Sequence, residues 1–185
     1  SSCAEGMRPS PVDGETPPPP RRGAHHLAIL WPGSYAEAAA SLGVHFLLGS
    51  LRGRPGFSAG RFMAEAGRGA PLSLEDRLPL RAFPVVLASV AWEMQAARLA
   101  STLERASIPP LAADRDDRHP VVIAGGALTL SSPHLLDPIA DVVIRGDGEE
   151  AMDALIDAFR SAARREDLIG AMRGAAGSSP GTRAS

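Results

Sequence analysis

HPVVIAGGALTLSSPHLLDPIADVVIRGDGEE, residues 119–150, carries the clearest signal for the fold of this chain. A short apolar run ends in Gly125-Gly126, and a second apolar run at residues 141–145 leads through a glycine turn to Glu149 and Glu150. Short apolar runs bounded by glycine predict buried strands, and acidic residues favour the first turn of a helix. The stretch therefore predicts two strands of an α/β sheet with ligand-type loops at their ends.

Similar apolar runs alternate with segments of helical periodicity along the rest of the chain. The runs predict strands at residues 26–31, 57–63, 83–92, 121–124 and 141–145. A first helix, capped by Ser34, carries Ala39, Leu42, Gly43 and Phe46 on its apolar face, and two further helices are expected at 94–107 and 149–164. Residues 64–80 are too broken by Gly and Pro for a regular second helix.

This alternation predicts an α/β fold with an open, doubly wound, mainly parallel five-stranded sheet of flavodoxin-like or cobalamin-binding-like type, its second helix missing. A chain of 185 residues with 44% hydrophobic content can bury one good core. We expect a disordered Pro-rich leader at 1–23, one domain at 24–165, and a helix end with a flexible Gly/Ser-rich tail at 166–185.

Composition excludes several classes of function. The net charge is −2 and no basic stripe with interleaved aromatics occurs, so nucleic acid is not an expected partner. The single cysteine, Cys3, can build neither a disulfide within the chain nor a cysteine-ligated metal site, which fits a reducing, cytoplasmic setting. The apolar runs are far shorter than a membrane helix needs, so no membrane is expected.

The common catalytic motifs are absent or out of context. The chain contains no lysine and hence no phosphate-binding loop of the G-x-x-x-x-G-K-[ST] type, and no G-x-G-x-x-G occurs. The string G-x-S-x-G occurs at residues 56–60 and 177–181, but neither copy stands between a predicted strand and a predicted helix, where a nucleophile elbow belongs. Ser131 and Ser132 near His134 are interpreted as turn and cap residues. His25 and His26 are neighbours on a strand, so they should point to opposite faces and cannot share a metal. We assign no catalytic and no metal-binding residue.

Ligands of open α/β sheets bind beyond the carboxyl ends of the strands. In this chain the rule selects the loops at residues 31–35, 89–93, 125–129 and 146–149. Glycine in such loops lets a ligand approach the backbone, but it also permits tight turns without any ligand, and both interpretations stay open. The candidate cofactor-binding residues in these loops are Ser34, Tyr35, Ser89, Glu93, Gly125, Gly126, Gly146 and Glu149.

Six short motifs occur in an order and spacing that point to one family. They are PGSY…SLG at 32–43, RP…RF at 54–62, PLSLE at 71–75, IPPLAADR at 108–115, VIAGG at 122–126 and GDGEE at 146–150. Over residues 27–163 the chain resembles the cobalamin-binding-like N-terminal domain of an uncharacterised family of radical S-adenosylmethionine (SAM) proteins.

The resemblance implies an accessory domain that precedes a barrel carrying a CxxxCxxC-bound [4Fe-4S] cluster and SAM. With only Cys3, this chain cannot hold such a cluster, so it is not expected to be catalytic alone. It would be an isolated domain, a truncated gene product, or a part supplied to a radical SAM barrel in cis or in trans.

The resemblance also implies which features of a cobalamin site are present. Relatives that bind cobalamin base-off have D-x-H-x-x-G after the first strand, whereas this chain has Pro32-Gly33-Ser34-Tyr35, so it offers no histidine lower ligand there. Asp117-Arg118-His119 repeats the first half of that motif before a different strand. Ser89 and the pair Gly125-Gly126 match the serine that contacts the nucleotide tail and the paired glycines.

Three hypotheses follow. The chain binds a corrinoid without a histidine ligand, across Ser89, Gly125, Gly126 and Gly146. Alternatively, it has lost the cofactor and only docks on a barrel or partner chain. Or it is a flavodoxin-like module that binds a small molecule or nucleotide.

Overall fold

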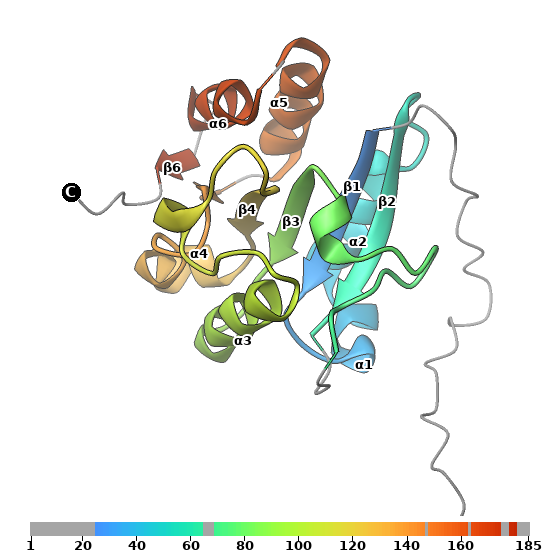
Figure 1. The fold of residues 1–185 in the computed structure, drawn as a ribbon, viewed down its shortest axis with the longest axis vertical. Coiled ribbons are helices and arrows are strands. Elements are labelled where there is room, and N and C mark those ends of the chain that lie inside the picture. The colour runs from blue at the N-terminus through green and yellow to red at the C-terminus, as the bar shows by residue number, and fades with distance from the viewer. Residues whose placement is uncertain (1–24, 65–68, 147, 163, 175–177, 181–185) are drawn as a thin grey trace, which may run out of the picture.

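The computed structural model describes residues 25–64, 69–146, 148–162, 164–174 and 178–180. The predicted leader and the end of the predicted tail lie outside these residues, so the domain boundaries remain a prediction. Figure 1 shows one sheet with helices on both of its faces. The strands are β1 (His25–Trp31), β2 (Phe57–Met63), β3 (Val85–Ser89), β4 (Val121–Gly125), β5 (Val142–Ile144) and β6 (Ser178–Pro180).

The strand order in space is β2-β1-β3-β4-β5-β6. Strands β1 to β5 are all parallel, which confirms the predicted open doubly wound α/β sheet of flavodoxin-like order. Strand β6 pairs antiparallel with β5 and was not predicted, because three residues in a Gly/Ser-rich stretch carry no strand signal. The predicted strand at 83–92 is shorter in the structure, ending at Ser89.

Helices cover the two faces of the sheet unequally. One core cluster joins the sheet to α2, α5 and α6, and the other joins it to α3, α4 and short 3₁₀ turns. The helices are α1 (Tyr35–Ala39), α2 (Leu42–Leu51), α3 (Glu93–Arg105), α4 (Leu128–Ser131), α5 (Gly148–Ser161) and α6 (Arg165–Gly174). The 3₁₀ turns are η1 (Leu80–Ala82), η2 (Ala112–Asp114) and η3 (Pro133–Leu135).

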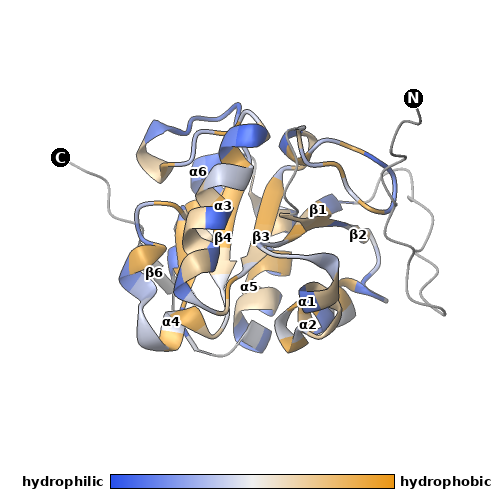
Figure 2. Ribbon diagram, turned by 90° about the horizontal axis from the view of Figure 1, so that it is seen from below, coloured by the Kyte–Doolittle hydropathy of each residue, from blue (hydrophilic) through white to orange (hydrophobic). Residues whose placement is uncertain are grey.

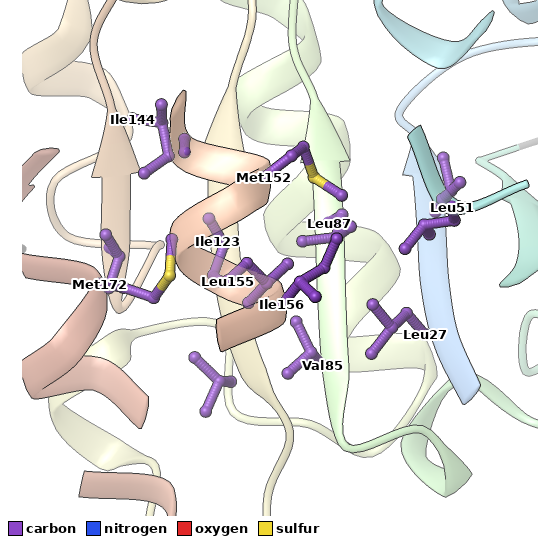
Figure 3. Close-up of a cluster of buried hydrophobic side chains, with 14 of the residues drawn as sticks. Leu27, Leu51, Val85, Leu87, Ile123, Ile144, Met152, Leu155, Ile156 and Met172 are labelled. Atoms are coloured by element: carbon purple, nitrogen blue, oxygen red, sulfur yellow. The ribbon is translucent and has the colours of Figure 1, made fainter. Parts of the chain in front are cut away.

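Strand β3 lies at the centre because its side chains are apolar on both faces. Val85 and Leu87 point into the cluster under α5, whereas Val86 and Ala88 belong to the opposite cluster. Figure 2 shows β3 and β4 coloured as hydrophobic. In Figure 3 side chains of α5, Leu155 among them, lie over these strands. Burial on both faces explains the continuous apolar run.

The predicted first helix is two helices in the structure. Helix α1 is capped by Ser34 as predicted, but the chain breaks at Ala40, and Ser41 caps α2 by accepting a hydrogen bond from the backbone of Val44. The apolar face predicted for one continuous helix is therefore wrong, and Leu42 is 84% exposed. Residues 166–174, predicted as a helix end that leads into a flexible tail, form most of a separate helix, α6, and bury Leu168, Ile169 and Met172.

In the connection between β2 and β3 the described residues, 64 and 69–84, contain one short helical segment, η1, and no α-helix. This agrees with the prediction that the second helix of the fold is missing. Two carboxylates fasten this connection to the sheet. Glu75 accepts hydrogen bonds from the backbone N of Arg61 at 2.7 Å and from its Nε at 2.6 Å, and both side chains of this ion pair are nearly buried. Asp76 accepts a hydrogen bond from Ser73 and pairs with His26 Nε2 at 2.9 Å.

His26 stacks on Phe83 with ring centroids 4.6 Å apart, whereas His25 lies 5.1 Å from Phe57, in the cluster on the other face. The predicted opposite orientation of the two histidines is confirmed. Burial opposes ionisation of Asp76, but hydrogen bonds from Ser73 and His26 outweigh it and lower the pKa of the carboxyl.

We expect Asp76→Asn to lower the free energy of unfolding by about 1–3 kcal/mol at pH 7, since a part-buried charged hydrogen bond is lost. The pKa of Asp76 is lower in the folded state than in the unfolded state. The charged side chain therefore stabilises the fold fully at pH values above the ordinary aspartate pKa. This stabilisation is lost as the pH falls through the folded-state pKa. Urea denaturation at pH 7 and at successively lower pH measures both effects. Asp157→Asn, in an exposed pair with Arg160, should change the free energy by less than about 0.5 kcal/mol.

Candidate functional site

A cavity of about 480 Å³ opens at the carboxyl edge of the sheet, between α2 and α5. Its floor is formed by the ends of β3, β4 and β5, through residues such as Leu87, Ile123 and Ile144. Its walls come from Phe46 and Leu47 of α2 and from Met152 and other residues of α5. This volume lies within the range of small-molecule sites, about 300–1,000 Å³.

The lining is apolar apart from Ser89, the one polar side chain among the described lining residues. Ser89 ends β3 and is 6% exposed. Helix α2 reaches this hydroxyl only because Gly43 has no side chain, since a Cβ there would lie 2.4 Å from Ser89 Oγ. The cavity thus fits an apolar or planar group that makes one hydrogen bond at its floor.

The structure brings four of the predicted site residues together in this cavity, namely Ser89, Gly125, Gly126 and Gly146. Gly126 has φ +109°, and a Cβ on it would lie 2.6 Å from the carbonyl oxygen of Val90. Gly146 has φ +99° but faces open space. The close approach of two loops accounts for Gly126, whereas only the backbone conformation requires glycine at 146.

The other four predicted residues do not line this cavity. Ser34 forms a capping box with Glu37, donating its backbone N–H to the carboxylate at 2.7 Å. These hydrogen bonds from Ser34 lower the pKa of Glu37. Tyr35 lines a separate cavity of about 220 Å³ between α1 and α2. Glu93 begins α3, and Glu149 lies in the first turn of α5.

Sequence reasoning missed the helical walls of the cavity. Phe46 and Leu47 of α2 and Ala151, Met152 and Leu155 of α5 line it, and Met172 of α6 joins them. The apolar periodicity of α5 predicts a buried face, and part of that face borders the cavity instead of the sheet. Periodicity cannot distinguish these two surroundings.

All five histidines of the chain are described, and none lines the cavity. Among the described residues no group of three or more His, Cys, Asp or Glu side chains is placed to hold a metal ion. The described helices include none that is long and apolar enough to cross a membrane.

The structure is an open α/β domain with an apolar cavity at the carboxyl edge of its sheet. A family model described as radical SAM proteins, N-terminal, matches residues 58–177, well over half of the chain. The chain therefore belongs to this family of N-terminal domains of radical SAM proteins. The match begins in β2 and includes β3, β4, β5 and α5, so it covers three of the four loops predicted at the carboxyl ends of the strands. No curated protein matches the chain.

Proposed function

We propose that the chain is a cobalamin-binding-like accessory domain and that the cavity between α2 and α5 receives the nucleotide tail of a corrinoid. The observation that carries this proposal is the apolar cavity of about 480 Å³, which has Ser89 at its floor and Gly125, Gly126 and Gly146 at its edge. The resemblance to cobalamin-binding-like domains implies the same serine and glycine pair. Open α/β sheets bind their ligands beyond the carboxyl ends of the strands, and this rule favours a ligand at this edge independently.

Each group has a role in this proposal. The Ser89 hydroxyl would hydrogen-bond a polar atom of the tail, and Leu87, Phe46 and Met152 would contact its apolar surface. No histidine of the chain lines the cavity, so the lower ligand of cobalt would not come from this domain. Cobalamin, when bound, would supply organocobalt chemistry at the carboxyl edge of the sheet.

The same edge is where we place the catalytic partner. Three large apolar side chains that follow β1, β3 and β4 are strongly exposed there, namely Leu42 at 84%, Met94 at 66% and Leu130 at 80%. Exposed apolar residues mark contact surfaces when several occur at one edge. We propose that they face the radical SAM barrel, which would provide the [4Fe-4S] cluster and SAM.

A mouth-filling variant tests the cofactor proposal. Ala127 lines the cavity, is exposed and belongs to no strand, so Ala127→Trp should obstruct the cavity without disturbing the core. Titration with hydroxocobalamin, followed by absorbance, should show binding to the parent chain and an affinity at least about tenfold weaker for Ala127→Trp. The matched control, Ala97→Trp on the exposed side of α3, should bind like the parent.

Absence of any spectral change with the parent chain would reject the cofactor proposal. The docking hypothesis, in which the domain has lost cobalamin and only contacts a barrel, would then be favoured by Leu42, Met94 and Leu130. Equal weakening by Ala97→Trp would show that binding does not occur in this cavity.

A further inference from the structure

A second cavity lies at the opposite edge of the sheet. It measures about 400 Å³ and includes Pro84 and Pro120, the residues just before β3 and β4. Its other walls come from the end of α5 and the start of α6. Because the first cavity lies at the carboxyl ends of the same strands, the two sites are separated by the length of the sheet.

The lining of this second cavity is strongly basic for a chain whose net charge is −2. Four arginines line it, Arg81, Arg118, Arg164 and Arg165, against the single carboxylate of Asp117. Arginine guanidinium groups match the geometry of phosphate oxygens and do not lose their charge near neutral pH.

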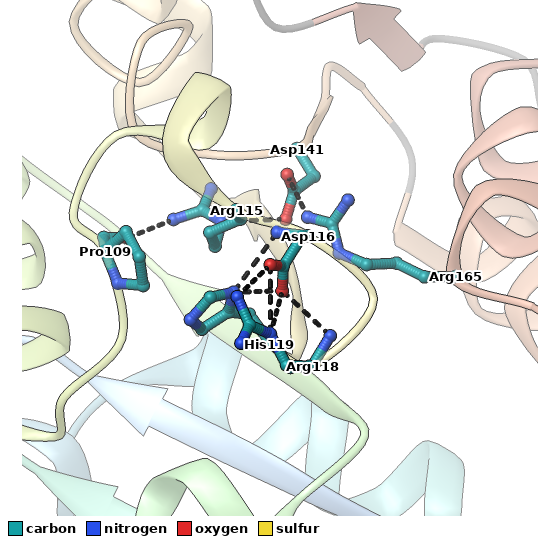
Figure 4. Close-up of polar contacts among 7 residues, drawn as sticks. All are labelled: Pro109, Arg115, Asp116, Arg118, His119, Asp141 and Arg165. Carbon is teal, nitrogen blue, oxygen red and sulfur yellow. Dashed lines mark hydrogen bonds and ion pairs between the residues drawn. The ribbon is translucent and has the colours of Figure 1, made fainter.

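Two of the four guanidinium groups already have carboxylate partners. Arg118 Nη2 lies 2.6 Å from Asp116 Oδ2, and the pKa of Asp116 is lowered by its hydrogen bonds from Arg118. Arg165 Nη2 lies 2.5 Å from Asp141 Oδ1 (Figure 4). Within the described part of the chain, no carboxylate pairs with Arg81 or Arg164, and both residues are exposed. These two groups are therefore available to an external anion.

A buried ion cluster, connected to the cavity through the lining residue Arg165, adds to the positive charge. Asp141 is shared by Arg165 and Arg115, whose Nε lies 3.2 Å from Asp141 Oδ2. The side chain of Arg115 is fully buried and that of Arg165 is 8% exposed, so two cations share one buried anion. Desolvation and the neighbouring Arg165 lower the pKa of Arg115 despite Asp141. An anion bound in the cavity would reduce this excess of positive charge.

Apolar side chains complete the lining. Phe83, Phe159 and Leu168 line the cavity beside the arginines. We propose that this cavity binds a small organic phosphate, with its phosphoryl group on Arg81 and Arg164 and its apolar body against Phe159 and Leu168. This site is independent of the corrinoid proposal, because the two cavities share no lining residue.

Isothermal titration calorimetry with phenyl phosphate tests this proposal at constant ionic strength. The parent chain should bind phenyl phosphate about fivefold or more tightly than inorganic phosphate, because the ring adds apolar contact. The double variant Arg81→Gln/Arg164→Gln should bind phenyl phosphate at least about tenfold more weakly than the parent. Its thermal unfolding without ligand should match that of the parent, since both arginines are exposed.

The matched control is Arg98→Gln/Arg160→Gln, which removes the same charge from exposed positions outside the cavity. Its affinity should stay within about twofold of the parent. The proposal is overturned if phenyl phosphate does not bind the parent, or if the two double variants weaken binding equally. Equal affinities for phenyl phosphate and inorganic phosphate would overturn the role of the apolar wall.

Discussion

Asp141→Asn should lower the free energy of unfolding by about 3–5 kcal/mol, which is a large part of the stability of an ordinary domain. Asp141 is 4% exposed and is the carboxylate that faces both Arg115 and Arg165. Asparagine retains the shape of the side chain but removes its charge, leaving two buried guanidinium groups without an anion. Urea denaturation followed by tryptophan fluorescence measures the loss.

The exposed pair Arg54–Asp153 provides the control for Asp141. Its side chains are 41% and 64% exposed, so Asp153→Asn should cost less than about 1 kcal/mol. Adding Arg165→Met to Asp141→Asn should recover part of the stability, because one uncompensated charge is removed. A loss below about 1 kcal/mol for Asp141→Asn alone would show that the buried cluster does not depend on its carboxylate.

Gly126→Ala should cost about 3 kcal/mol or more, because it combines a steric clash with an unfavourable backbone conformation. The added Cβ would lie 2.6 Å from the carbonyl oxygen and 3.0 Å from the nitrogen of Val90. Two hydrogen bonds hold this contact in place, from Val90 N to Gly125 O at 2.8 Å and from Leu128 N to Val90 O at 3.1 Å. Backbone atoms fixed in this way cannot move aside as a flexible side chain can.

Gly146→Ala separates the two contributions. Gly146 also has a positive φ, but no atom lies within 4 Å of its Cβ position, so only backbone strain of about 1–2 kcal/mol is expected. Thermal or urea unfolding of both variants gives the comparison. Equal losses would mean that the Val90 contact contributes nothing and that Gly126 is required for its backbone conformation alone.

The sequence predicted the sheet well, because β1, β3, β4 and β5 contain apolar runs whose side chains are buried in the structure. The bounds of β2 were predicted correctly despite Gly60, which is needed because a Cβ there would lie 2.8 Å from Phe83. The break between α1 and α2 was missed because the run Ala38-Ala39-Ala40 favours a continuous helix. Tertiary contacts, which the sequence pattern does not show, decide where the helix ends. Helix α6 was missed because it follows a charged, alanine-rich segment without a clear stop signal.

The candidate site was predicted only in part, because the strand pattern determines one edge of the site and not its helical walls. Ser89, Gly125, Gly126 and Gly146 follow consecutive parallel strands, so the topology alone places them at one edge. The helical walls depend on how far α2 and α5 stand apart, and no local pattern encodes that distance. The second cavity, at the other edge of the sheet, is lined by both Arg81 and Arg164. Tertiary structure brings these two residues to one cavity, and neither belongs to a sequence motif.

The connection between β2 and β3 constrains the order in which the domain assembles. A helix would make its own hydrogen bonds before docking, but the contacts that fasten this connection to the sheet, from Glu75 to Arg61 and from Asp76 to His26, need strands that have already formed. Contacts of this kind join residues that are far apart in the sequence. Their formation closes a loop, which costs chain entropy, so they are expected to form late in folding. Strand β2 and its connection are therefore expected to join a nucleus built from β1, β3 and β4.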